Sequence, residues 1–261
     1  AWVERIRLQV SKYLDFNAKE NAAIVANNLD WTANVDVLTF LRDVGKHFSV
    51  NNMIAKESVK QRIEREGAGI SFTEFTYMIL QSFDFAELNK RYGCELQIGG
   101  SDQWGNIVTG TELIRRKSGG EAYAVTTPLI KKADGSKFGK TEGGNVWLSK
   151  ERTSPYKFYQ YWLNTSDADA QNYIRIFTLL SKSEIEHLEG QHQEAPHLRI
   201  LQKALAEDIT KRVHGEKELE AAINASEILF GKATKESLQQ LSTDDFLAVF
   251  EGVPQAIVSK S

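Results

Sequence analysis

Two lysines lie three residues apart in a short loop that glycines flank on both sides. The loop reads Lys-Phe-Gly-Lys-Thr over residues 137–141, follows the pair Asp134-Gly135 and precedes Gly143-Gly144. Two ammonium groups in such a loop suit a reaction on a polyphosphate, because negative charge builds on the departing phosphate oxygens in the transition state. Lysine-rich turns are also common at protein surfaces, so the loop alone is equally compatible with a solvated turn.

A stripe of polar residues is expected on one helix. Ser71 and Glu74 form the Ser-x-x-Glu pattern of a capping box, which predicts that a helix begins here. Tyr77, Gln81 and Asp84 follow at positions i, i+4 and i+7 and share one face of that helix. The stripe is either a polar outer face or the wall of a pocket. In the pocket, Asp84 would accept a hydrogen bond from a ligand hydroxyl, and Tyr77 and Gln81 would hold a ligand ammonium.

A glycine-rich turn joins a short strand candidate, which ends at Ile98, to a helix candidate. Gly99 and Gly100 allow close approach of a ligand to the backbone, and Asp102 and Gln103 open the helix. Ligands of open α/β sheets bind at such strand-to-helix turns. The spacing does not match the dinucleotide fingerprint G-x-G-x-x-G. A simple tight turn would also explain the two glycines.

In this order and spacing, the three segments closely resemble the tyrosyl-tRNA synthetases of bacterial type, and the resemblance covers nearly the whole chain. The lysine loop is similar to this family's form of the class I signature Lys-Met-Ser-Lys-Ser, with both lysines kept. Four runs carry the resemblance: Phe40–Ser49, Gly69–Phe75, Gln97–Asn106 and Lys137–Thr141.

The resemblance implies that the polar stripe binds L-tyrosine. Tyr77 and Gln81 would bind the amino group of the substrate, Asp84 would accept its phenolic proton, and Gln97 would support the pocket. Phenylalanine would leave polar groups of this pocket unpaired, which would select against it.

The resemblance also implies an ATP site and a two-step reaction. Gly100 and Asp102 would contact the adenosine part of ATP, with Asp102 on the ribose, and Gln103 would lie near the reacting carboxylate and the α-phosphate. The carboxylate of tyrosine attacks the α-phosphate to give tyrosyl-adenylate, and the tyrosyl group then passes to tRNA(Tyr). Such a reaction depends on positioning and charge stabilisation rather than on a covalent nucleophile. Any metal would be Mg²⁺ arriving with ATP. The residues expected to close over the pyrophosphate are Lys137, Lys140 and Thr141.

Two features of the family are not found in this sequence. None of the five histidines belongs to a His-x-Gly-His motif, which in the family lies in the first half of the nucleotide-binding fold, and the family's small C-terminal RNA-binding module is not found. The chain also starts at Ala1, inside what reads as a helix. We therefore expect a synthetase fragment that has little or no adenylation activity alone.

The composition is that of an ordinary globular protein, with 41% hydrophobic and 26% charged residues. The single cysteine, Cys94, excludes an internal disulfide framework and indicates a reducing compartment, so we expect a cytoplasmic protein. No run approaches the ~20 apolar residues of a membrane span. The net charge of −3 does not itself indicate a nucleic-acid partner. Arg115-Arg116-Lys117 and Lys131-Lys132 are each either a solvated face or an RNA contact.

The chain is expected to have two parts. Residues 1–148 mix helix and strand and fit the C-terminal part of a Rossmann-like nucleotide-binding catalytic domain of the α/β class, with a dimer-forming insertion. Residues 149–261 read as an all-α domain, which the resemblance makes the anticodon-side domain. Its first helix is rich in aromatic residues, which favours core packing over stacking on bases. The expected helices span 2–14, 36–44, 54–65, 72–90, 103–117, 198–214, 217–230, 234–241 and 244–250. Three more are expected to begin at the N-caps Ser154, Ser166 and Ser181, the second running to about 180 and the third to about 189. The expected extended segments are 95–98, 122–126 and 145–148.

Apolar residues between positions 36 and 75 are either ordinary core or, as the resemblance implies, partly a homodimer interface. Two other functions remain open: a catalytically dead paralogue that binds RNA, and a sister class I synthetase such as the tryptophan-specific one. The face formed by Tyr77, Gln81 and Asp84 favours tyrosine over tryptophan. The loop lysines argue against a dead paralogue.

Overall fold

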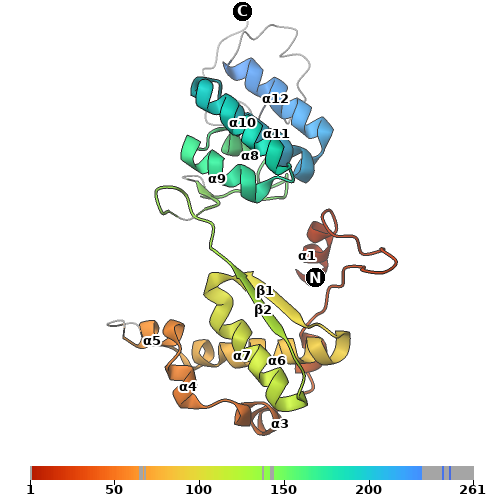
Figure 1. Ribbon diagram of the computed structural model, residues 1–261. Coiled ribbons are helices and arrows are strands. Elements are labelled where there is room, and N and C mark those ends of the chain that lie inside the picture. The colour runs from red at the N-terminus through yellow and green to blue at the C-terminus, as the bar shows by residue number, and fades with distance from the viewer. Residues whose placement is uncertain are drawn as a thin grey trace, which may run out of the picture. The chain divides into compact units, whose positions relative to one another are not determined.

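The chain folds into two compact units, Ala1–Leu129 and Ile130–Ser261. The computed structural model describes residues 2–64, 67, 69–136, 138–141, 144–230, 243 and 247. Both units appear in Figure 1, where the first is coloured from red to green and the second from green to blue.

The first unit contains two parallel strands joined through a helix. β1 (Leu96–Gly100) pairs with β2 (Tyr123–Thr127), and Leu96 lies opposite Tyr123. Between them, the short 3-10 helix η2 (Ser101–Gln103) leads into α7 (Trp104–Ser118). Parallel neighbours need such a crossover connection. The predicted order of strand, helix and strand is confirmed.

α6 (Phe72–Tyr92) and α7 pack closely against each other. α6 begins with the predicted capping box, in which Ser71 Oγ accepts from the Glu74 amide and the Glu74 carboxylate accepts from the Ser71 amide. A Cβ atom on Gly110 of α7 would come within 2.9 Å of Phe85 Cδ1 on α6. The two helices can approach this closely because α7 carries no side chain at that point. The core around them includes Met78, Phe83, Ile107, Leu113 and Ile114.

The helices before α6 are shorter than the sequence predicts. One helix was predicted over 54–65, but the structure forms α4 (Val50–Ile54) and α5 (Glu57–Ile63), so this prediction is wrong. Lys56 between them is extended, with φ −68° and ψ 135°. Its half-buried ammonium donates to the carbonyl of Gly105 at 2.9 Å, a tertiary contact that no local pattern encodes. The remaining helices here are α1 (Trp2–Val10), α2 (Leu29–Thr32), α3 (Val37–Asp43) and the 3-10 helix η1 (Gly45–His47).

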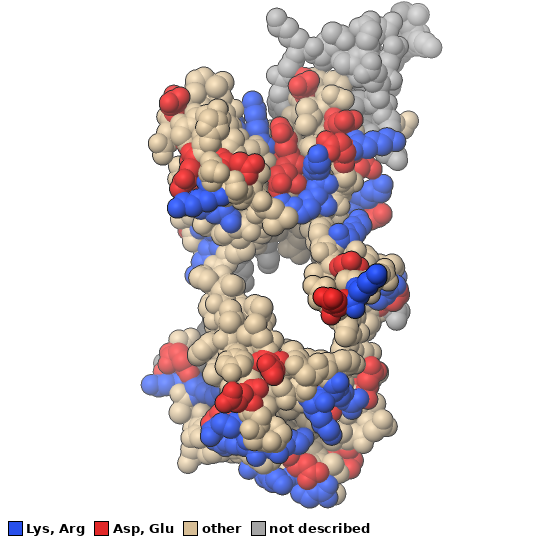
Figure 2. All heavy atoms as spheres, turned by 45° about the vertical axis from the view of Figure 1, so that its right-hand side comes forward, with Lys and Arg blue, Asp and Glu red and all other residues tan. Residues whose placement is uncertain are grey.

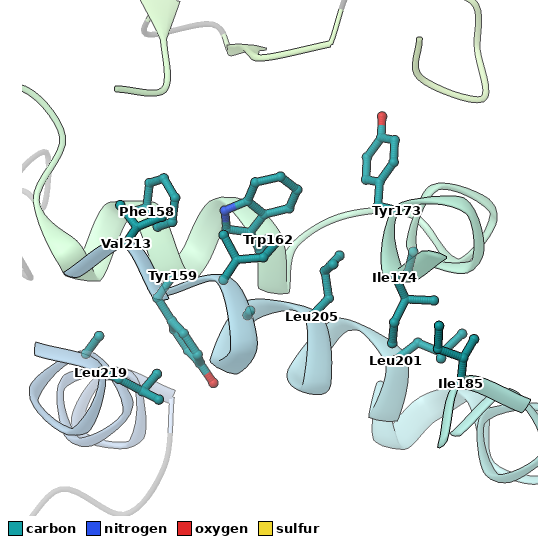
Figure 3. Packing of buried hydrophobic residues seen from close by; sticks show 14 residues of the cluster. Phe158, Tyr159, Trp162, Tyr173, Ile174, Ile185, Leu201, Leu205, Val213 and Leu219 are labelled. Carbon is teal, nitrogen blue, oxygen red and sulfur yellow. The ribbon is translucent and has the colours of Figure 1, made fainter. Parts of the chain in front are cut away.

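The second unit is a helical bundle over most of its described length. Its three predicted N-caps, Ser154, Ser166 and Ser181, each accept a hydrogen bond from the amide three residues later. The aromatic residues of the first helix lie mainly in the core, as predicted, and Figure 3 shows them meeting side chains of the other helices. The predicted helices 234–241 and 244–250 lie outside the described residues, except residue 247. The elements are α8 (Pro155–Leu163), α9 (Asp167–Phe177), α10 (Lys182–Glu194), η3 (Pro196–Leu198), α11 (Ile200–His214) and α12 (Glu216–Phe230).

A short hairpin precedes these helices and packs with them. β3 (Lys140–Thr141) and β4 (Gly144–Asn145) are antiparallel, with Lys140 opposite Asn145. Ile130, Phe138 and Val146 pack against the helical core. The segment 130–148, which the sequence analysis placed in the first part, therefore belongs to the second compact unit.

The surface carries charges of both signs. Figure 2 shows basic and acidic side chains on each unit, in keeping with the small net charge of −3. Within the described ranges, no helix has the length and apolar character needed to cross a membrane.

Candidate functional site

The three residues of the polar stripe lie on α6 as the helical spacing predicts. Tyr77 is 56% exposed, whereas Gln81 and Asp84 are half-buried. Met78 and Phe83, which neighbour the stripe, are buried. The stripe therefore leads from the protein surface toward the interior rather than forming a fully solvated face.

Asp84 is held by two donors from outside α6. Trp31 Nε1 donates to Asp84 Oδ1 at 2.8 Å, and Asn28 Nδ2 donates to Asp84 Oδ2 at 3.2 Å. Trp31 is only 5% exposed, and the guanidinium of Arg91 lies over its ring at 5.5 Å. Each carboxylate oxygen thus has one donor and keeps capacity for another. The carboxylate is oriented, yet it can still accept a hydrogen bond from a ligand.

A row of polar side chains connects α6 to the turn after β1. Asn106 Nδ2 donates to Gln81 Oε1 at 3.1 Å and lies 3.4 Å from Gln103 Oε1. Gln103 Nε2 in turn donates to Asp102 Oδ2 at 3.3 Å. The structure therefore brings Gln81 of the polar stripe together with Asp102 and Gln103 of the turn, which the sequence analysis had treated as separate segments.

The two glycines at the end of β1 lie close to other side chains of the same unit. A Cβ atom on Gly100 would lie 2.7 Å from Asp102 Oδ1 and 2.9 Å from Leu129 Cδ2. A Cβ atom on Gly99 would lie 3.0 Å from Gln103 Cβ. Both glycines lie in β1 with extended backbone rather than in a tight turn, and the crowding at Gly100 reflects how close Asp102 lies to the end of the strand.

Gln97 has a buried carbonyl oxygen that lacks a hydrogen-bond partner among the described residues. Its neighbour across the sheet is Ala124, which packs against the core of the first unit. A buried polar atom without a partner is unfavourable unless another molecule supplies a donor. Gln97 is therefore suited to a supporting role beside a ligand.

The lysine loop lies in the second unit and is only partly described. Lys137 lies outside the described residues, and for Lys140 and Thr141 only the backbone is described. The ring of Phe138 packs among aromatic residues of α8 and α9, and the amide of Gly139 donates to the hydroxyl of Tyr161 at 3.3 Å. Burial raises the pKa of the Tyr161 phenol above its ordinary value.

The basic side chains at 115–117 contact other groups of the same unit. The carboxylate of Glu112 lies 3.5 Å from the guanidinium of Arg115 and 3.1 Å from that of Arg116. Arg116 also donates to the carbonyl of His47, and the ammonium of Lys117 lies over the ring of Phe83 at 5.5 Å. These partners fit a structured, solvated face.

Three residues of the site carried no role in the sequence analysis. Asn106 closes the polar row, while Asn28 and Trp31 orient Asp84 from 56 and 53 positions earlier in the chain. Asn106 ended a run that was already singled out and could have been found there. No local sequence pattern reveals the contacts of Asn28 and Trp31 with Asp84, because these residues are 56 and 53 positions away in the chain.

The described residues include no group of three or more His, Cys, Asp or Glu side chains that could hold a metal ion. A resident metal therefore has no ready donor set in this part of the chain. Mg²⁺ bound through the phosphates of a nucleotide would need few protein ligands.

Comparison with known protein families gives one match over most of the chain. The family model described as tRNA synthetases class I (W and Y) matches residues 1–231. Curated relatives include a protein named tyrosine–tRNA ligase from Bacteroides fragilis, 60% identical over 257 residues, which are 98% of this chain and 60% of the relative. Another of that name, from Flavobacterium johnsoniae, is 58% identical over 262 residues, which are 99% of this chain and 61% of the relative. The chain thus spans about three fifths of the length of these relatives.

A solved structure has the same fold. A C-terminally truncated mitochondrial tyrosyl-tRNA synthetase from Aspergillus nidulans superimposes with a TM-score of 0.70 and 29% sequence identity. The likeness covers 87% of this chain and 66% of that one. It confirms the predicted fold, in which part of a Rossmann-like α/β domain is followed by a helical domain.

Proposed function

Because the chain belongs to the class I tRNA synthetases of the tryptophan and tyrosine type, we propose that it serves a tyrosine–tRNA ligase. That enzyme joins L-tyrosine to the AMP part of ATP as tyrosyl-adenylate, with release of pyrophosphate, and then transfers the tyrosyl group to tRNA(Tyr) with release of AMP. The observation that carries the proposal is the orientation of Asp84 by Trp31 and Asn28, which presents a half-buried carboxylate at the inner end of a polar stripe.

The amino-acid pocket is proposed to lie along α6. A phenolic hydroxyl would donate to Asp84, and the ammonium group would lie at the outer end, near Tyr77 and Gln81. Gln97 would support the pocket with its unpartnered carbonyl oxygen. The increasing burial from Tyr77 to Asp84 supports this orientation. It lets the phenol of the substrate point inward and leaves its reacting carboxylate near ATP.

The ATP site is proposed to lie at the turn after β1. Asp102 would bind the ribose, the backbone at Gly100 would contact the adenosine, and Gln103 would lie near the α-phosphate. Gln103 is linked to Gln81 through Asn106, so this row joins the proposed sites of the two substrates. Lys137, Lys140 and Thr141 would stabilise the pyrophosphate leaving group. Mg²⁺ would arrive with ATP and be held mainly by its phosphates.

We propose that the two units have different functions. The first unit and the lysine loop would belong to the catalytic part, and α8–α12 would form the anticodon-side part that faces tRNA(Tyr). Apolar side chains in the segment 36–75 that are exposed in the single chain would form a homodimer interface: Val37, Leu38, Leu41, Ile54 and Phe72. We expect the enzyme to work in the cytoplasm, where its tRNA is used.

The test is ATP–pyrophosphate exchange by the full-length gene product that contains this chain, measured with each proteinogenic amino acid in turn. Exchange with tyrosine alone is the expected result. Exchange with tryptophan alone would indicate the sister enzyme of the same family. No exchange with any amino acid would indicate a catalytically dead paralogue.

A further inference from the structure

Phe138, in the middle of the lysine loop, is held by a box of four aromatic rings. Its ring stacks on Phe177 with centroids 4.9 Å apart and an interplanar angle of 21°. Tyr173 meets it edge-on at 5.2 Å, and Trp162 and Tyr161 lie at 5.8 and 6.3 Å. Offset-stacked and edge-on pairs are the favourable aromatic arrangements. The loop therefore inserts a side chain into the surface of the helical bundle.

The four rings belong to α8 and α9, and hydrogen bonds from these two helices also hold the backbone of the loop and of the segment before it at three points. The Gly139 amide donates to Tyr161 Oη on α8 at 3.3 Å. The Ala133 amide donates to Asp169 Oδ1 on α9 at 2.7 Å, and Tyr173 Oη donates to the Lys131 carbonyl at 3.4 Å. Side chains of α8 and α9 thus hold the lysine loop at Gly139 and the segment before it at Lys131 and Ala133.

The described part of the loop leaves open space beside the helices. A cavity of about 970 Å³ lies beside it, lined by Asn145 and Val146 of the hairpin side and by Gln160, Asn164 and Asp169 of the helices. The hairpin segment therefore packs on the helices only in part. The ring of Phe138 packs against the helical core and contacts four aromatic rings there.

The backbone leaves this anchor directly into β3, where Lys140 begins the hairpin. Gly139 has φ +78°, a left-handed conformation that reverses the chain between Phe138 and Lys140. The Val146 amide donates to the Gly139 carbonyl at 3.2 Å and fixes the base of the hairpin. The position of the Lys140 backbone is therefore set by Phe138 and Gly139.

We propose that Phe138 and Tyr161 are positioning residues for the adenylation step, through which the helical unit holds the lysine loop in its active arrangement. This inference rests on the proposed function. A lysine on an unanchored loop must be ordered at each turnover, and that cost raises the barrier. Removing the anchor should therefore lower kcat while leaving the binding of tyrosine intact, because the amino-acid pocket is built from other residues.

The test uses the full-length gene product with Phe138→Ala, Phe138→Met, Tyr161→Phe and the matched control Tyr159→Phe. Tyr159 lies on the same helix, and the described contacts give it no ring pairing with Phe138. Phe138→Ala should lower kcat for pyrophosphate exchange by about 100-fold, with tyrosine affinity unchanged. Met fills irregular apolar space and contacts aromatic rings well, so Phe138→Met should recover most of the loss. Tyr161→Phe should cost about 3- to 10-fold in kcat, and Tyr159→Phe nothing.

Deuterium uptake by the segment 138–146 provides a readout that does not depend on activity. It should be faster in Phe138→Ala than in the wild type, and Phe138→Met should restore slow uptake and confirm that the bundle still folds. Wild-type kcat in Phe138→Ala, or unchanged uptake, would overturn the positioning role. Failure of the wild type to exchange with tyrosine would instead overturn the proposed function. The deuterium uptake data would still show whether Phe138 holds the loop on the helices.

Discussion

At the scale of single residues, selectivity is proposed to depend on one carboxylate and its two donors. Asp84 is neither fully buried nor fully solvated, and its orientation is set by Trp31 and Asn28. A ligand that donates a hydroxyl to such an acceptor binds more tightly, and one that leaves the acceptor unpaired binds more weakly. The phenolic group of tyrosine meets this condition, and the ring of phenylalanine does not.

Asp84→Ala should erode the preference for tyrosine over phenylalanine. A hydrogen bond to a charged group contributes about 1.5–3 kcal/mol, so the ratio of the two kcat/KM values should fall by about 10- to 100-fold. Pyrophosphate exchange with each amino acid measures it. Asp43→Ala, which removes an exposed carboxylate that pairs with Arg42, is the control. An unchanged ratio in the Asp84 variant would rule out this role.

Trp31→Phe should raise KM for tyrosine by about tenfold, because it keeps the buried ring but removes the N–H that orients Asp84. Steady-state exchange kinetics at saturating ATP measure the effect. Trp2→Phe, at a position that is 75% exposed, serves as the control. Equal KM values in wild type and the Trp31 variant would mean that Asp84 needs no such orientation.

The residues on α6 and in the turn after β1 could be selected from sequence because they lie in local patterns with fixed spacing. The residues that contact them could not be selected in this way. Trp31 and Asn28 lie far from Asp84 along the chain, and the unpartnered carbonyl of Gln97 becomes apparent only when its surroundings are built. Sequence also suggested that Gly100 makes room for a ligand, whereas in the structure it makes room for Asp102 and Leu129.

At the scale of elements, local signals located most helices and both parallel strands. Capping residues are short-range devices, and the serines at 71, 154, 166 and 181 correctly marked the starts of α6, α8, α9 and α10. The division between α4 and α5 was missed because Lys56 leaves the helical conformation to reach Gly105. The segment 130–148 was grouped with the first 129 residues in the sequence analysis, whereas its apolar side chains, such as Phe138, pack on helices that follow it.

The packing of α8 predicts a specific alkaline sensitivity. Burial, together with the nearby carboxylates of Glu207 and Glu227, raises the pKa of Tyr159 from 10.0 to about 12. Between these values the unfolded phenol has lost its proton and the folded one has kept it. Its contribution is fully present below pH 10.0 and is lost as the pH rises toward about 12.

Tyr159→Phe should therefore flatten the decline of stability in that window. One proton corresponds to a slope of about 1.4 kcal/mol per pH unit. Denaturant unfolding below and within the window measures the slope, and Tyr92→Phe, at an exposed position, is the control. An equal decline in the Tyr159 variant and the wild type would show that this phenol is not responsible.

At the scale of the whole molecule, the segment 36–75 carries large apolar side chains that the single chain leaves exposed. Val37 and Leu38 of α3 are 72% and 79% exposed, and Phe72 at the start of α6 is 79% exposed. Other apolar residues of the same segment, such as Val44 and Met53, are buried, so the segment serves partly as core and partly as open surface. Exposed apolar groups that cluster in this way mark an interaction surface.

Light scattering at micromolar concentration should give the mass of a dimer, and Leu38→Glu should give that of a monomer. A buried charge without a partner at the interface is costly, which is why one substitution should suffice. Leu179→Glu is the matched control, since Leu179 is 84% exposed but lies in the second unit. A monomeric wild type, or an unaffected Leu38 variant, would contradict the dimer proposal.

The most direct test of the central claim is a crystal structure of the full-length gene product bound to a non-hydrolysable analogue of tyrosyl-adenylate. We predict that the phenolic oxygen lies within about 3 Å of the Asp84 carboxylate, with the amino group at Tyr77 and Gln81 and the ribose at Asp102. An analogue bound elsewhere, or one whose phenol points away from Asp84, would contradict the account.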